Sequence, residues 1–191
     1  MKVAILSGTS RAGNNTIRVA KALEKVHQAK GHTTHIVDFR GYDLPFFNGE
    51  DLDEDNPTPF QNELLTSWGD ADLVYVLSPE YNWLVTPEIA NMTNHYSGKN
   101  HKNLYHNKVF GFVGVSSGIG GRLPTMQLSS VFEKLVFYLD GESVCSPNKF
   151  ESHYTPKELD EDGNFILNSG YQSRMESFVN YNTRLCLRFK Q

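Results

Sequence analysis

The sequence predicts an α/β domain in which five parallel strands form one sheet covered by helices on both faces. Short continuous apolar runs, such as residues 3–6, are typical of parallel strands buried on both sides. Between these runs, apolar residues recur at helical spacing. Repeated alternation of strand and helix favours right-handed crossovers. A chain of 191 residues suits one domain, so residues 1–191 are expected to fold as a single unit.

The expected strands differ in how clearly the sequence marks them. Residues 3–6, 73–77 and 109–113 are continuous apolar runs and predict three buried strands. Residues 35–38 and 142–145 are weaker candidates for the second and fifth strands.

Helices are expected between and after these strands. One apolar stripe comprises Ile17, Ala20, Leu23 and Val26, and another comprises Met126, Leu128, Val131 and Leu135. A last helix is expected over residues 169–187, with Phe178, Tyr181 and Leu185 facing inward. Residues 41–69 are acidic and contain proline, which predicts a long surface excursion with a short helix near residues 60–68.

Composition excludes several classes of protein. The net charge of −4 argues against a nucleic-acid or anionic-membrane surface. No apolar run approaches the roughly 18 residues of a membrane span, and no secretory cleavage pattern follows the first apolar run. Cys145 and Cys186 lack metal or redox spacing, and we expect no metal site. We therefore expect a soluble cytoplasmic protein without a nucleic-acid or membrane partner.

The loop after the first expected strand is the first candidate site. It is rich in hydroxyl and amide side chains and leads directly into a helix, whose N-terminal N–H groups favour an anion. It contains neither the lysine of a Walker A loop nor three glycines of a dinucleotide fingerprint, so it suits a phosphate that is held and not transferred. An ordinary helix cap would give the same local pattern. The candidate phosphate ligands are Thr9, Ser10, Arg11, Asn14 and Thr16.

Two further loops are expected at the same edge of the sheet. In the strand order 2-1-3-4-5, the loops after the first, third and fourth strands are neighbours, and FMN lies at such a switch point. Packing aromatics and a tight turn are the alternative interpretation of these loops. The third strand is followed by Pro79, Glu80, Tyr81, Asn82 and Trp83, and the fourth by Ser116, Ser117, Gly118, Ile119, Gly120 and Gly121.

These three loops resemble those of the flavodoxin-like NADPH-dependent FMN reductases, a group that includes quinone, azo-dye and chromate reductases. Residues 8–16 resemble the family's G-S-x-R-x-x-S-x-N loop, residues 79–82 its P-E-Y-N segment, and residues 119–121 its double-glycine turn. The resemblance spans roughly residues 2–140. The chain departs from the pattern at Trp83 and Leu84, where the family usually has Gly-Ser.

The resemblance implies a flavodoxin-like fold, FMN as cofactor and NADPH or NADH as co-substrate. The loop at residues 9–16 would hold the FMN phosphate, and residues 79–82 would lie beside the flavin ring. Residues 116–121 would lie at the opposite ring edge, where backbone N–H groups can stabilise the reduced ring. No catalytic acid or base is required of the protein. A homodimer or homotetramer is also implied.

The function expected on this basis is hydride transfer from NAD(P)H through FMN to a quinone-like or other small acceptor. A reductase whose acceptor is free flavin is the nearest alternative. A flavodoxin-type electron carrier, or a flavin-binding protein without nicotinamide turnover, is the alternative from another class. The acidic middle segment is compatible with a carrier, and NADPH oxidation distinguishes the classes.

Overall fold

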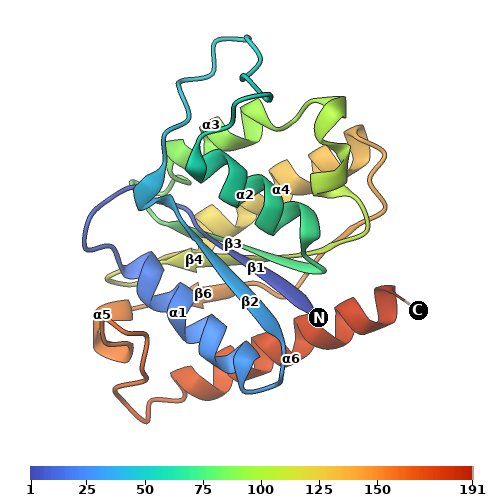
Figure 1. Cartoon of the computed structure of the whole chain (residues 1–191). Helices are drawn as coiled ribbons and strands as arrows, with labels where there is room; N and C mark the ends of the chain where they lie inside the picture. Colours follow the sequence, from blue (N-terminus) through green and yellow to red (C-terminus); the bar gives the residue numbers. More distant parts are fainter. Residues whose placement is uncertain (191) are drawn as a thin grey trace.

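A parallel sheet with helices on both faces organises the chain, as the sequence predicts (Figure 1). The computed structural model describes residues 1–190. The strand order is β2-β1-β3-β4-β5, with β6 also paired to β4, and the pairings between these strands are all parallel. The strands are β1 (Lys2–Ser7), β2 (Thr33–Asp38), β3 (Leu73–Pro79), β4 (Val109–Val115), β5 (Val144–Cys145) and β6 (Phe150–Ser152).

Helices connect the strands and cover the sheet. None of those in the described residues is long and apolar enough to cross a membrane. The α-helices are α1 (Asn15–Gln28), α2 (Pro59–Asp70), α3 (Pro87–His95), α4 (Arg122–Tyr138), α5 (Thr155–Glu158) and α6 (Tyr171–Phe189), and 3-10 helices occur at Phe39–Gly41 and Lys99–Tyr105.

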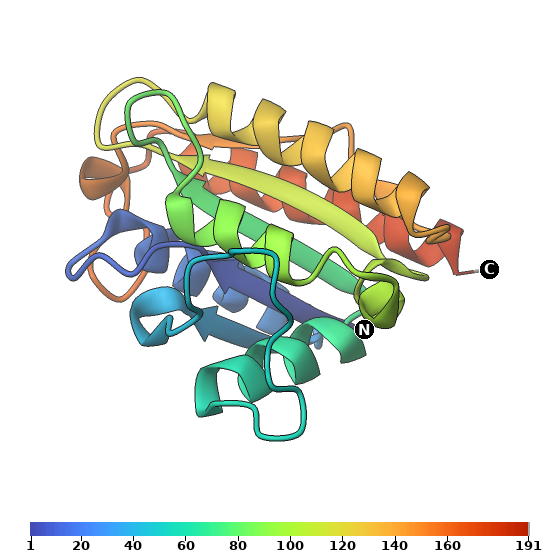
Figure 2. The ribbon, with the colours of Figure 1, turned by 90° about the horizontal axis from the view of Figure 1, so that it is seen from above.

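The sheet lies between two layers of helices (Figures 1 and 2), and a hydrophobic core fills each side. On one face, Ile5 belongs to a buried cluster with Leu23 of α1 and Phe178 of α6. On the other face, Leu6 belongs to a cluster with Trp68 of α2, and this cluster extends to α3 and α4. Successive residues of β1 therefore enter opposite cores, which explains why its sequence is continuously apolar.

Local sequence signals fix the helix starts. Asn14 precedes α1, and its side-chain oxygen accepts a hydrogen bond from the Ile17 N–H at 2.8 Å. Thr58 and Gln61 form a reciprocal capping box at the start of α2, with Pro59 at the first helical position. The expected helix near residues 60–68 is thus present and slightly longer.

The fifth strand departs from the prediction. The expected strand at residues 142–145 is reduced to β5, whereas β6 pairs with the carboxyl half of β4. Two short strands therefore share the position beside β4. The Ser146 N–H still donates to the Phe110 carbonyl of β4, residues 147–149 lie between the two strands, and no run of apolar residues marks β6 in the sequence.

The apolar stripe expected in the fourth helix was also partly wrong. Leu128 of α4 is buried, but Met126 is 51% exposed and Val131 is 43% exposed. Phe132 takes the inward position and stacks on Trp68, with ring centroids 5.9 Å apart. Apolar residues occur on several sides of this helix, so its inward face could not be identified by hydrophobicity alone.

The strand register brings three loops together. Ser7 at the end of β1 is paired with Leu77 of β3, and Pro79 at the end of β3 is paired with Val115 at the end of β4. The carboxyl ends of these neighbouring strands consequently meet at one edge of the sheet, where ligands of such folds bind.

Candidate functional site

A cavity of about 220 Å³ lies at this edge, and all three loops line it. The loop after β1 contributes the most residues, and the loops after β3 and β4 form the other walls. Seven residues were predicted, while Gly13, Asn15 and Val115 were missed, although they lie next to predicted residues in the sequence. The lining residues are Arg11, Gly13, Asn14, Asn15, Pro79, Glu80, Tyr81, Val115, Ser116 and Ser117.

The loop after β1 is shaped by Asn14, which acts as a helix cap as well as lining the cavity. Besides accepting from Ile17, its side-chain amide donates to the Arg11 carbonyl at 2.7 Å. The adjacent Gly13 has a φ of 62°, a left-handed conformation suited to glycine. The amide that was expected to donate to a phosphate is therefore used to hold the loop.

Features of this loop fit a phosphate group. Arg11 is exposed and has no ion-pair partner among the described residues. The first turn of α1 contains no acidic residue. Thr16, in that turn, has a buried hydroxyl without a hydrogen-bond partner in the described part of the chain, and such an atom calls for one. A bound phosphate would place a negative charge beside the Arg11 guanidinium, and its oxygens would accept hydrogen bonds from the N-terminal N–H groups of α1.

Thr9 and Ser10 lie outside the cavity lining. The buried Thr9 hydroxyl lies 3.0 Å from the Tyr81 hydroxyl, which joins the loops after β1 and β3. The Ser10 N–H donates to the Glu88 carboxylate of α3 at 2.8 Å, and the Ser10 hydroxyl donates to the same oxygen. In the structure, both predicted phosphate ligands thus connect elements of the protein.

The loop after β3 ends in a tight turn with unusual backbone angles. Tyr81 and Leu84 exchange backbone hydrogen bonds of 3.2 and 3.1 Å. Between them, Asn82 has a φ of 49° and Trp83 a φ of 65°. Two positive φ values define the turn type that favours Asn-Gly, so tryptophan at the second position is strained by about 1–2 kcal/mol. Trp83 is 67% exposed and lies outside the cavity lining, which rules out a core position in this chain.

The glycine loop after β4 is held by side chains from elsewhere. The Gly120 N–H donates to His153 Nδ1 at 3.2 Å, and the Gly121 N–H donates to the Glu80 carboxylate. The Gly118 N–H donates to the Ser116 hydroxyl. Glu80 therefore positions the loop in addition to lining the cavity. Among the described residues, the N–H of Ser117 has no protein acceptor and remains available to a ligand.

The C-terminal segment supports the glycine loop, a role that no sequence motif indicated. The Ser116 N–H donates to the Ser152 carbonyl at 2.9 Å, and the Tyr154 N–H donates to the Gly118 carbonyl at 2.9 Å. The Thr155 N–H completes the set by donating to the Ser116 carbonyl. Residues 152–155 thus act as a backbone scaffold for one wall of the cavity.

A second polar anchor shapes the surface beside the site. The Asn91 amide of α3 donates to the Tyr42 hydroxyl and to the Pro45 carbonyl, both at 2.7 Å, and its oxygen accepts from the Phe47 N–H. Burial raises the pKa of Tyr42 to about 12, so the phenol stays neutral at physiological pH. Asn91 accordingly fixes the otherwise irregular segment that follows β2.

The chain is similar to known redox proteins. Residues 1–149 match a family model described as NADPH-dependent FMN reductase. A relative from Oryza sativa subsp. japonica, described as probable NADPH:quinone oxidoreductase 2, is 27% identical over 169 residues, covering 87% of this chain and 79% of that protein.

Solved structures share the fold over the full length. The flavoenzyme NAD(P)H:(acceptor) oxidoreductase FerB from Paracoccus denitrificans has a TM-score of 0.72 at 20% identity, covering 96% of this chain and 97% of FerB. An azoreductase from Bacillus anthracis str. Sterne has a TM-score of 0.57 at 10% identity, covering 98% and 99% of the two chains. At these identities the likeness concerns the fold.

Proposed function

The chain belongs to the NADPH-dependent FMN reductase family and is an oxidoreductase that uses FMN and NADPH; we propose that its FMN lies in the cavity formed by the three loops. Electrons would pass to a quinone-like or other small acceptor, since the rice relative is described as a probable NADPH:quinone oxidoreductase. The observation that carries the proposal is the single cavity lined by the loops after β1, β3 and β4.

The protein's part in this chemistry is to bind and orient. Bound FMN supplies hydride acceptance from NADPH and electron delivery to the acceptor. Arg11 and the start of α1 would hold the phosphate, with Asn14 keeping the loop in shape. Tyr81 and the Ser117 N–H would border the ring, while Glu80 and His153 hold the glycine loop in place. No side chain is assigned a proton-transfer step.

Purified protein provides the direct test. It is expected to be yellow, to release FMN on denaturation, and to oxidise NADPH in the presence of a simple benzoquinone, followed as loss of nicotinamide absorbance. Faster NADPH oxidation with free FMN as acceptor than with the quinone would favour the flavin-reducing alternative. Bound FMN without NADPH oxidation would indicate an electron carrier and overturn the proposed turnover.

The proposal includes the assembly and the compartment. We place a homodimer or homotetramer of the single-domain chain in the cytoplasm. Exposed apolar side chains of α4 support self-association, because Leu123, Met126 and Val131 are between 43% and 51% exposed. Light scattering of the purified protein reports the assembly directly.

Replacing Arg11 by alanine should weaken FMN much more than riboflavin. The lost contact is a charge-assisted hydrogen bond to phosphate, worth about 1.5–3 kcal/mol, or roughly 10- to 150-fold in Kd. Flavin fluorescence titration of the apoprotein measures both affinities. Arg40→Ala is the control, since Arg40 is paired with Asp38 and lies outside this cavity. Equal losses for FMN and riboflavin would contradict the phosphate assignment.

We expect the exposed indole of Trp83 to overhang the flavin face that NADPH must reach, a gating role, so replacing it by glycine should speed flavin reduction by NADPH. FMN retention should also weaken, because an aromatic contact with the ring contributes about 0.5–1.5 kcal/mol beyond its buried area. Stability should change by less than about 1 kcal/mol, since relief of backbone strain opposes the added freedom of the unfolded chain. Stopped-flow reduction and urea unfolding measure the two effects. The buried Trp68→Ala control should lose about 3–5 kcal/mol. An unchanged reduction rate with a large loss of stability would contradict the gating role.

A further inference from the structure

A groove of about 420 Å³ lies between the segment around β6 and the N-terminal half of α6, and one of its lining residues, His153, is hydrogen-bonded to the glycine loop. Apart from Asn148 and Lys149, at the end of the family match, its lining residues lie beyond that match. Its polar lining comes from two segments that are distant in the sequence. Its polar side chains include Lys149, Glu151, His153, Ser173, Arg174 and Ser177.

The groove presents unpaired positive charge. The Arg174 guanidinium carbon lies 5.5 Å from the ring centroid of Tyr171 and 6.0 Å from that of Phe150, so aromatic contacts orient the side chain. Within residues 1–190, neither Arg174 nor Lys149 has a carboxylate at ion-pair distance. Such a pair of cations suits a phosphate monoester.

The one acidic side chain of the groove is already engaged. The Glu151 carboxylate lies 3.6 Å from His153 Nε2 and 4.0 Å from a terminal nitrogen of Arg122. Among the described residues, neither Lys149 nor Arg174 has a nitrogen within ion-pair distance of this carboxylate. The hydroxyl of Ser177, in the next turn of α6 after Arg174, adds a neutral donor to the same lining.

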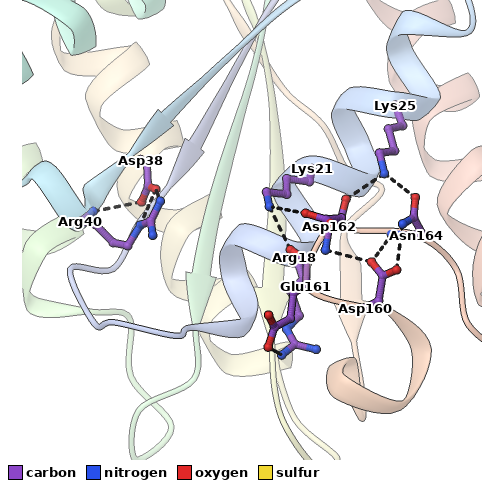
Figure 3. A network of polar contacts seen from close by, with 9 residues as sticks. All are labelled: Arg18, Lys21, Lys25, Asp38, Arg40, Asp160, Glu161, Asp162 and Asn164. Atoms are coloured by element: carbon purple, nitrogen blue, oxygen red, sulfur yellow. Dashed lines mark hydrogen bonds and ion pairs between the residues drawn. The ribbon is translucent and has the colours of Figure 1, made fainter.

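Another basic hollow flanks the flavin cavity, but its cations are neutralised (Figure 3). Arg18 pairs with Glu161 at 3.5 Å and Lys21 pairs with Asp162 at 3.2 Å. Arg40 is held by Asp38 through two side-chain nitrogens. A phosphate entering there would have to displace carboxylates, whereas the groove beside α6 requires no such displacement.

His153 places the groove next to the redox site. It lines the groove and accepts the hydrogen bond from the Gly120 N–H, while Ser116 and Ser117 of the same loop line the flavin cavity. We propose that Lys149 and Arg174 bind the phosphate on the adenosine ribose of NADPH, the group that NADH lacks, and thereby select NADPH. This inference rests on the proposed placement of FMN in the neighbouring cavity.

Binding of nucleotide fragments tests the inference without turnover. Calorimetry would compare adenosine 2′,5′-bisphosphate, adenosine 5′-monophosphate and inorganic phosphate on the wild type and on Lys149→Gln and Arg174→Gln. Each substitution should weaken the bisphosphate roughly 10- to 150-fold and leave the monophosphate nearly unchanged. Arg184→Gln is the matched control on α6, because Arg184 is exposed and lies outside the groove.

Steady-state kinetics with both nicotinamides complete the test. The KM for NADPH should rise by at least about tenfold in the two variants, with the kinetics of NADH unchanged and thus reporting an intact fold. Equal effects on NADPH and NADH, or none on either, would overturn the inference while leaving the proposed function intact. Loss of inorganic phosphate binding alone would identify a free-anion site and would also overturn it. Absence of turnover in the wild type would instead count against the proposed function.

Discussion

Lowering the pH from 6.5 to 5 should reduce the free energy of unfolding by about 2 kcal/mol through His27 alone. His27 is fully buried, with Nε2 3.1 Å from the Tyr75 hydroxyl and Nδ1 2.8 Å from Nδ1 of His32. Burial, followed by repulsion from His32, lowers the pKa of His27 from its ordinary 6.5 to about 3. The unfolded chain therefore takes up a proton at pH values where the folded chain does not, and stability falls as the pH falls.

The lowered pKa of His27 sets both the direction of the stability change and the pH range in which it occurs. Well above pH 6.5 both states are neutral at His27 and its contribution is constant, whereas each pH unit below 6.5 costs about 1.4 kcal/mol until the folded pKa is reached. Burial also lowers the pKa values of His32 and His101, which act in the same direction. The carboxylate of Asp72, whose pKa is lowered despite its burial by a hydrogen bond from Lys190, loses its stabilising charge only at more acidic pH.

Urea unfolding at pH 7.5, 6.5, 5.5 and 5.0 measures the effect. The slope should become shallower in His27→Gln, which removes the titrating group. A wild-type stability that is flat between pH 6.5 and 5 would contradict the assignment of a buried neutral imidazole.

Replacing Gly114 by alanine should cost about 1–3 kcal/mol of stability and reduce the retention of FMN. A Cβ at Gly114 would lie 1.8 Å from the carbonyl oxygen of Gly121 and 2.6 Å from its Cα. Both neighbours are backbone atoms, and Gly121 itself has a φ of 95° at the start of α4. The glycine loop would have to move away from β4, which shifts a wall of the cavity proposed to hold FMN.

Gly118→Ala is the matched control in the same loop. A Cβ at Gly118 meets no atom within 4 Å, so the stability and FMN affinity of the Gly118→Ala variant should remain near those of the wild type. Thermal unfolding and release of FMN on dilution measure both variants. Similar behaviour of the two alanine variants would show that the close approach at Gly114 has no influence on the site.

The sequence predicted the centre of the fold better than its margins. β1, β3 and β4 are buried on both sides, so their continuous apolar runs coincide with the strands. At the sheet edge, β6 is only Phe150–Ser152, and its pairing with β4 depends on a tertiary contact that leaves no local pattern. The short helix α3, which was not predicted, has a mixed composition with Asn91 and Thr93 among its buried residues.

In the candidate site too, some features could be predicted from the sequence and others could not. Arg11, Tyr81 and Ser116 were expected because they follow strands at the carboxyl edge, and all line one cavity. The pairing of Ser10 with Glu88 could not be predicted, since it depends on the orientation of α3. The role of each predicted residue toward FMN remains a prediction for the experiments above.

The backbone hydrogen bonds between residues 152–155 and the glycine loop show that the family match and the structural unit end at different residues. The match to the family model ends at residue 149, but the glycine-loop wall of the cavity is held from beyond that point. The Ser152 hydroxyl also contacts the Tyr171 hydroxyl of α6 at 2.7 Å, which links the last helix to the same wall. A fusion or truncation designed at the end of the family-model match would therefore divide a cooperative unit, and the C-terminal part of the chain must be kept with the rest of the domain in any engineered variant.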